Sequence, residues 1–326
     1  MEDNKNYHDH QVAEVIREGE PDRGSVRLSA EPNLNSAMRL YLFVFILLLV
    51  LGSILQILHF EVGMFLTQWV IILPPALWYW RRHNVDRVSF ARLHPLQLRF
   101  LPAVVILAAS FWLLNMVIAA GLMLGMMELG YQPLESIPPP DTLGQYIIYI
   151  LVIAVSAGIC EEMLFRGTIL PSMEGEGIIP AIVFSSFLFA LYHISFTNLI
   201  STFMLGAVIA VVVIKTGSLW GGVIYHMLNN FVAVTYLYAA GGIEKTAELE
   251  TVEHWPLLLL LLPALVGVYA GLRMLHREAD REPLLNGVRR WLPKNWFGWP
   301  LLIGIILFLL MAMLELAIGF GWFNIL

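Results

Sequence analysis

Residues 143–170 read LGQYIIYILVIAVSAGICEEMLFRGTIL, an apolar stretch that carries three charges, on Glu161, Glu162 and Arg166. A stretch of this length is sufficient to cross the ~30 Å hydrocarbon core of a membrane as one helix. Each charged side chain placed in hydrocarbon costs roughly 2.5–3.5 kcal/mol on insertion scales. Charges that are retained at this cost mark a candidate functional site.

The whole chain has the composition of a polytopic membrane protein. Of its 326 residues, 58% are hydrophobic and 13% are charged, and the mean hydropathy is +0.73. A soluble domain carries about 25% charged residues. We therefore expect an all-α integral membrane helical bundle of about eight or nine transmembrane helices. The candidate helices are residues 38–58, 62–80, 101–126, 143–170, 178–195, 198–214, 217–240, 255–275 and 298–320.

The fifth and sixth candidate helices are short, and little polar sequence separates them. Irregular backbone at membrane depth is tolerated where it lines a protein or water cavity, so this pair is expected to be partly re-entrant. By composition the chain divides into four regions. These are a polar cytoplasmic tail without fixed structure (1–36), N-terminal helices (37–142), the segment with the charge cluster (143–240), and C-terminal helices with a basic cytoplasmic loop (241–326). The tail has no signal-peptide pattern.

Basic residues predict the orientation in the membrane. In a nine-helix topology all of the 19 Lys and Arg residues except Lys245 fall on one side. Cytoplasmic loops are the ones enriched in Lys and Arg, so the N-terminus is expected in the cytoplasm and the C-terminus outside. The net charge of −6 and the lack of a nucleic-acid-binding motif indicate that nucleic acid is not a partner.

The spacing of the three charges predicts different tasks for them. Glu162 and Arg166 are four residues apart and share a helix face, so they are expected to form an ion pair. Glu161 points about 100° away and has no counter-charge in its own helix. We interpret it as a free carboxylate that faces a cavity and could act as a general base. The alternative is a purely structural ion pair that locks helices together, but such a pair does not need Glu161.

Two histidines complete the buried polar set. Of nine histidines, His193 and His226 lie well inside candidate helices. Phe189 precedes His193 by four residues and Asn230 follows His226 by four, so each pair shares a helix face. Taken singly, such residues also serve as polar contacts between membrane helices. Glu315, in the last helix, has no basic partner there; it faces a cavity or lies in a shallow helix.

Three ordered motifs carry a family resemblance. Glu161-Glu162-x-x-x-Arg166, Phe189-x-x-x-His193 and His226-x-x-x-Asn230 resemble the motifs of the CPBP family. These are the CAAX proteases and bacteriocin-processing enzymes, also called the Abi family. The resemblance covers roughly residues 143–240. It implies an intramembrane endopeptidase with a catalytic core of four helices.

The resemblance also implies roles for individual residues. Glu161 is the general base, His193 positions and polarises a water molecule, and Asn230 with His226 stabilises the oxyanion. Glu162, Arg166 and Phe189 have supporting roles. Glu161, His193 and His226 are also a familiar zinc-ligand set, so a metalloprotease with bound Zn is an open alternative. The balance slightly favours a metal-free site, because an asparagine beside His226 suits an oxyanion hole better.

The implied substrate is a membrane protein or peptide, cut at a CAAX-like tail, a leader peptide or a sorting tail. The expected location is the plasma (inner) membrane of a bacterium. A non-catalytic membrane immunity or scaffold protein of the same fold is the alternative function. A small-ion transporter is less favoured, because the sequence lacks the repeated broken helices typical of that class.

Overall fold

The structure is a computed structural model that describes residues 33–134, 137–240, 258–279 and 298–322. These residues form helices and, within the described ranges, no strand, which confirms the predicted all-α class. The first two membrane helices contain π-helical segments: α2 (Leu34–Leu47), η1 (Leu48–Gly52) and α3 (Ser53–Leu58), then α4 (Phe60–Leu66), η2 (Thr67–Ile72) and α5 (Leu73–Arg82). The fourth is built from α8 (Leu143–Tyr149), η4 (Ile150–Ser156), α9 (Ala157–Leu164) and η5 (Phe165–Ile169).

The other long helices are continuous. They are α7 (Leu101–Glu128), α10 (Ile178–Tyr192), α11 (Leu199–Thr216), α12 (Leu219–Ala240), α15 (Leu261–Ala279) and α16 (Trp299–Gly319). Three short elements lie between them: α6 (Arg87–Phe90), η3 (Leu98–Phe100) and η6 (Glu174–Glu176).

All nine predicted helices are present, and six of them meet the length and hydropathy expected of a membrane span. The six are Leu34–Leu58, Phe60–Arg82, Leu98–Glu128, Leu143–Ile169, Leu199–Thr216 and Trp299–Gly319. The chain is therefore an integral membrane protein with a polytopic helical bundle. α10 has 15 residues, and at 1.5 Å per residue it is about 22 Å long, shorter than a ~30 Å core.

Local sequence explains where several helices begin and end. Asn33 and Ser36 form a capping box at the start of α2, and the side chain of Thr142 caps α8. Pro102 lies in the first turn of α7, where a missing backbone N–H costs nothing. Gly217 ends α11 in the left-handed conformation, with φ 63°, which glycine adopts without strain.

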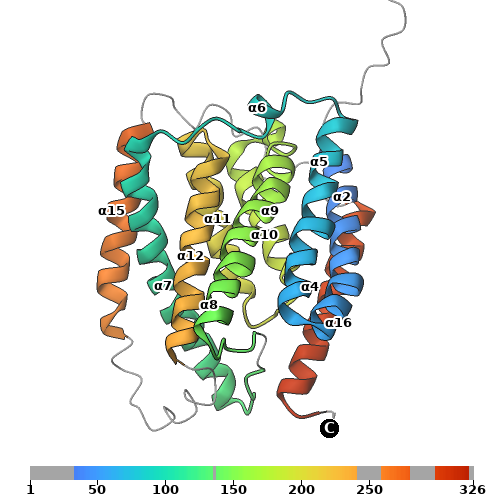
Figure 1. Cartoon of the computed structure of the whole chain (residues 1–326), viewed down its shortest axis with the longest axis vertical. Helices are drawn as coiled ribbons and strands as arrows, with labels where there is room; N and C mark the ends of the chain where they lie inside the picture. Colours follow the sequence, from blue (N-terminus) through green and yellow to red (C-terminus); the bar gives the residue numbers. More distant parts are fainter. Residues whose placement is uncertain (1–32, 135–136, 241–257, 280–297, 323–326) are drawn as a thin grey trace, which may run out of the picture. The chain divides into compact units, whose positions relative to one another are not determined.

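The packing of the helices places α9 at the centre (Figure 1). On one side α12 packs against α9 and η4, and on another side η2 and α5 pack against α9. α10 and α11 pack against each other, as do α7 and α15, while α16 contacts α2 and α10. The buried apolar core runs through these contacts. The fourth membrane helix is therefore held by helices that precede it and by helices that follow it in the sequence.

Several sequence predictions fall outside the described residues. They concern most of the polar tail (residues 1–32), the loop with Lys245, and the greater part of the basic loop (residues 280–297). α2 begins at Leu34, so its first three residues fall within the predicted tail.

Candidate active site

The predicted ion pair between Glu162 and Arg166 is confirmed. Nη1 of Arg166 donates to Oε1 of Glu162 over 3.0 Å, and the two side chains are 1% and 0% exposed. Nη2 of Arg166 donates to the carbonyl oxygen of Gly206 in α11 over 2.8 Å. The guanidinium carbon lies 4.4 Å from the centre of the Phe189 ring in α10. A buried charge needs more than one partner. Arg166 finds its further partners on α10 and α11, and these contacts join the fourth helix to both.

Glu162 has a further partner that spacing did not predict. Nδ1 of His226, a side chain buried in α12, lies 2.8 Å from Oε1 of Glu162. A carboxylate oxygen accepts hydrogen bonds, so Nδ1 is the donor and Nε2 is the ring nitrogen left for other contacts. Glu162 therefore fixes the tautomer and the orientation of His226, in addition to pairing with Arg166.

Glu161 turns away from this ion pair, as the angle between neighbouring helical residues predicts. Its side chain is buried, and Oε1 accepts a hydrogen bond from Nε2 of Gln68 in η2 over 2.8 Å. Oε2 has no hydrogen-bond partner among the described residues and lies 4.0 Å from Nε2 of His193. Glu161 is thus a buried carboxylate with one oxygen held and the other directed toward a histidine.

His193 does not lie inside a helix, which corrects the predicted boundary. α10 ends at Tyr192, and His193 is its C-terminal cap residue. Its Nδ1 donates to the carbonyl oxygen of Phe189 over 2.8 Å, and the two rings contact each other with their centres 4.6 Å apart. Since that carbonyl can only accept, the neutral ring keeps a lone pair on Nε2, the nitrogen nearest Glu161.

The segment after His193 is held by Glu315, whose place the sequence left open. Oε2 of Glu315 accepts from the backbone N–H of Phe196 over 2.6 Å, and Oε1 accepts from the hydroxyl of Thr197 over 2.7 Å. Ile194 has φ 53°, a left-handed conformation that is strained for a β-branched residue. Such strain persists where surrounding contacts fix the backbone. Glu315 supplies those contacts from α16.

Asn230 joins α12 to the fourth helix. Its Nδ2 donates to the carbonyl oxygen of Ile153 in η4 over 3.0 Å, and its Oδ1 accepts from Nδ2 of Asn229 over 3.2 Å. One of the two hydrogens on Nδ2 is therefore engaged with the backbone. The predicted oxyanion role of Asn230 rests on the remaining hydrogen and stays a prediction.

The alternative zinc set of Glu161, His193 and His226 is not gathered around one point. Within the described ranges, no three His, Cys, Asp or Glu side chains lie close enough together to hold a metal ion. His226 directs Nδ1 to Glu162, whereas the oxygen that faces His193 belongs to Glu161. The donor arrangement does not fit a three-ligand zinc site, and we derive no chemical step through a metal.

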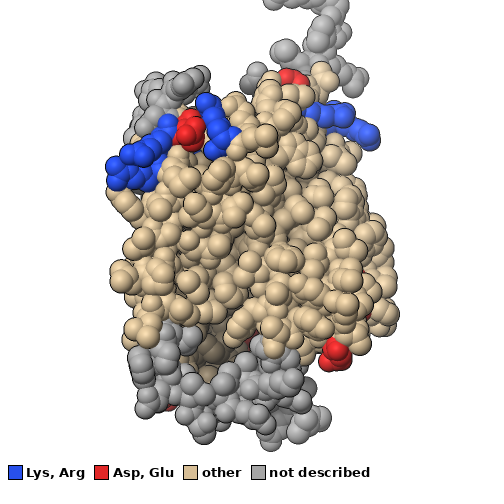
Figure 2. Space-filling view, turned by 60° about the vertical axis from the view of Figure 1, so that its left-hand side comes forward, with Lys and Arg blue, Asp and Glu red and all other residues tan. Residues whose placement is uncertain are grey.

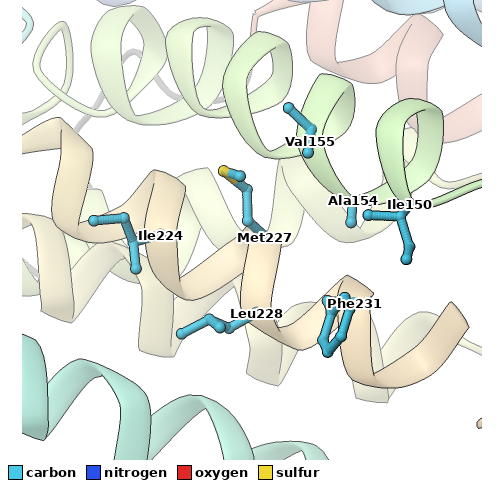
Figure 3. A pocket seen from close by; sticks show the side chains of 7 residues that line it. All are labelled: Ile150, Ala154, Val155, Ile224, Met227, Leu228 and Phe231. Carbon is cyan, nitrogen blue, oxygen red and sulfur yellow. The ribbon is translucent and has the colours of Figure 1, made fainter. Parts of the chain in front are cut away.

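An apolar cavity of about 230 Å³ lies between η4 and α12 (Figure 3). Two of its lining residues are sequence neighbours of polar-site residues: Ala154 follows Ile153, whose carbonyl binds Asn230, and Met227 follows His226. The lining residues are Ile150, Ala154, Val155, Ile224, Met227, Leu228 and Phe231. The cavity can accept an aliphatic group beside the candidate oxyanion residues.

Sequence reasoning missed Gln68. The predicted site was built from ionisable side chains within spans, and Gln68 carries an uncharged amide. A signal was nevertheless present, since Gln68 is the one amide side chain in the span Phe60–Arg82. An amide at membrane depth must find a hydrogen-bond partner.

Comparison with known proteins gives a family match for the segment that carries these residues. Residues 143–232 match a family model described as type II CAAX prenyl endopeptidase Rce1-like. The chain matched no curated protein and no solved structure. The matched residues run from α8 into α12 and include Glu161, His193, His226 and Asn230. The match identifies residues 143–232 as a domain of the CAAX protease (CPBP) family.

Proposed function

We propose that this protein is an intramembrane endopeptidase in which Glu161 and His193 activate a water molecule. The observation that carries the proposal is the 4.0 Å distance between Oε2 of Glu161 and Nε2 of His193. In the neutral tautomer fixed by Phe189, both atoms are hydrogen-bond acceptors. Two acceptors at this distance can each lie about 2.8 Å from one water oxygen, and that water then donates one hydrogen to each.

In the proposed reaction the water oxygen bonds to the carbonyl carbon of the peptide while Glu161 takes a proton. The carbonyl oxygen becomes an oxyanion, which requires donors aimed at it. We assign this task to Asn230 and His226 on α12. His226 donates to the oxyanion from Nε2 in its doubly protonated form, while its Nδ1–H stays on Glu162. When the C–N bond breaks, the proton on Glu161 passes to the departing nitrogen. The products are a carboxylic acid and an amine, and the carboxylate of Glu161 is restored.

The apolar cavity supports a substrate that presents an aliphatic or lipid-like side group. We propose a membrane-associated substrate, cut in a CAAX-like tail, a leader peptide or a sorting tail. Binding of a group that fills the cavity contributes about 0.8 kcal/mol for each CH₂ removed from water. The lining residues belong to the fourth membrane helix and to α12, which also carry Glu161, His226 and Asn230. We therefore expect a group in the cavity to hold the adjoining peptide bond near these residues.

We further propose that the N-terminus is cytoplasmic and that the membrane is the bacterial inner membrane. Exposed Lys and Arg side chains gather at one end of the bundle (Figure 2). Three exposed arginines lie at or after the end of the second span: Arg81 and Arg82 are in its last turn, and Arg87 follows it. The positive-inside rule places such an end in the cytoplasm.

The test of the proposed function is cleavage of a peptide library by purified protein in liposomes. Glu161→Gln keeps the shape of the side chain and removes the base, so cleavage is expected to fall at least ~10³-fold, the lower range for a lost base and misplaced water. Glu174→Gln is the matched control, because Glu174 pairs with Arg92 away from the site. It is expected to cut like the unmodified protein.

Equal cleavage by Glu161→Gln and the unmodified protein would overturn the proposal. Each assay is repeated with a chelator. Retained cleavage supports water activation by glutamate and histidine, while chelator-sensitive cleavage that divalent zinc restores would replace it with a metal-dependent mechanism.

A further inference from the structure

We infer that Gln68 is a positioning residue for Glu161, and that the second membrane helix therefore completes the active site. The inference rests on the proposed function, because it assigns Gln68 a task toward the proposed base. Gln68 lies outside residues 143–232, the part of the chain that matches the family model. It is 3% exposed and belongs to η2.

The first step is the geometry of the hydrogen bond. Nε2 of Gln68 donates to Oε1 of Glu161 over 2.8 Å, a length typical of a bond to an ionised acceptor. A carboxylate can rotate and exchange its two oxygens. Holding Oε1 removes that freedom, so Oε2 is kept toward Nε2 of His193, 4.0 Å away. Gln68 thereby selects which oxygen takes the proton from water.

The second step is the way in which η2 is fixed. Trp69, the next residue, donates from Nε1 to Oγ of Ser156 over 2.9 Å. Thr67, the preceding residue, accepts from Nε2 of Gln56 in α3 over 3.3 Å. Single-turn π-helical segments occur frequently at functional sites. Here η2 directs two consecutive side chains, Gln68 and Trp69, to the fourth membrane helix. Thr67 forms its hydrogen bond with α3 of the first membrane helix.

The third step separates this role from ordinary interhelical contact. A polar contact that only joins helices could use any partner on α9. Gln68 instead binds Glu161, the carboxylate whose other oxygen has no hydrogen-bond partner among the described residues and lies 4.0 Å from Nε2 of His193. Trp69 already joins the same two helices through Ser156. Loss of the Gln68 bond therefore leaves η2 attached to the fourth helix, while Glu161 becomes free to rotate.

The test compares kcat and KM for Gln68→Met, Gln68→His and Gln56→Met in liposomes. Gln68→Met keeps the length and removes the donor, so kcat is expected to fall roughly 10- to 100-fold, as for a misplaced catalytic group. KM is expected to stay within about twofold, since Gln68 acts on the base and not on bound substrate. Gln68→His keeps an N–H at similar reach and is expected to recover part of kcat. Gln56→Met removes a hydrogen bond on the same helical hairpin and is expected to leave kcat unchanged, because Trp69 still holds η2 against the fourth helix through Ser156.

The outcomes are distinct for the inference and for the proposed function. Full kcat in Gln68→Met, together with an inactive Glu161→Gln, would overturn the inference alone. Activity in Glu161→Gln would overturn both. Equal losses of kcat in Gln68→Met and Gln56→Met, with a lowered unfolding temperature in both, would assign Gln68 a structural role and reject the positioning role.

Discussion

Removing the positive charge at Arg166 is expected to destabilise the protein strongly. At the observed 3.0 Å, two unit charges attract each other by about 5.5 kcal/mol at an effective dielectric of 20. In Arg166→Met the carboxylate of Glu162 stays buried with His226 as its remaining partner. Removing one partner of a buried ion pair lowers the free energy of unfolding by about 3–5 kcal/mol. We take this range to include the lost hydrogen bond from Arg166 to the carbonyl oxygen of Gly206.

The assay is unfolding of purified protein in mixed micelles by a denaturing detergent, followed by circular dichroism. The double variant Arg166→Met with Glu162→Gln removes both charges and is expected to regain at least about 2 kcal/mol of the lost stability. Arg92→Met is the matched control, because its ion pair with Glu174 is partly exposed, at 21% and 23%. Its expected cost is within about 1 kcal/mol.

Two results would refute this reasoning. A loss below about 1 kcal/mol in Arg166→Met would mean that Glu162 needs no buried counter-charge. A double variant as unstable as the single one would mean that packing of the long arginine side chain, and not charge, carries the effect. The lost van der Waals contact of the arginine side chain with the Phe189 ring would then be the main contribution.

Three further predictions follow from the same structure. Glu315→Gln weakens the hydrogen bonds that hold the segment after His193. We expect kcat to fall several-fold and the free energy of unfolding to fall by about 1.5–3 kcal/mol. An unchanged kcat would show that this segment does not contribute to catalysis. Ala154→Phe fills the apolar cavity and is expected to raise KM for substrates with large aliphatic groups by roughly 10- to 200-fold; an equal KM would place the substrate elsewhere. Cys160, the one cysteine, is fully buried, so labelling by a maleimide reports a newly introduced thiol. In Arg87→Cys that thiol is expected to react with a membrane-impermeant maleimide in inverted vesicles. Labelling in right-side-out cells would reverse the proposed orientation.

The contacts that the sequence predicted are those within one helix. Four-residue spacing placed Glu162 beside Arg166 and Phe189 beside His193, and the structure confirms both proximities. The apolar runs also predicted the nine helices, because a long apolar stretch in hydrocarbon must satisfy its own backbone hydrogen bonds. The error at the end of α10 has a local cause. The left-handed turn at Ile194 carries no glycine, so no residue type announced it.

The contacts that the sequence did not predict join distant segments. Glu162 and His226 are 64 residues apart, and Gln68 and Glu161 are 93 apart. No helical period relates such positions, and their pairing is decided by which helices pack together. Glu315 shows the same limit. Its lack of a basic partner was visible in the sequence, whereas the backbone N–H groups that satisfy it lie 118 and 119 residues away.

The two adjacent carboxylates show how one helix can serve stability and chemistry together. Glu162 faces an arginine and a histidine, so its charge is compensated and its oxygen Oε1 is shared between two helices. Glu161, one residue earlier, faces an amide on one oxygen and an acceptor nitrogen near the other. The bonds from Arg166 and His226 to Glu162 hold the fourth membrane helix in place. Oε2 of Glu161 instead lies opposite Nε2 of His193, with which it can share a water molecule, and this placement is the feature that suits Glu161 to take a proton.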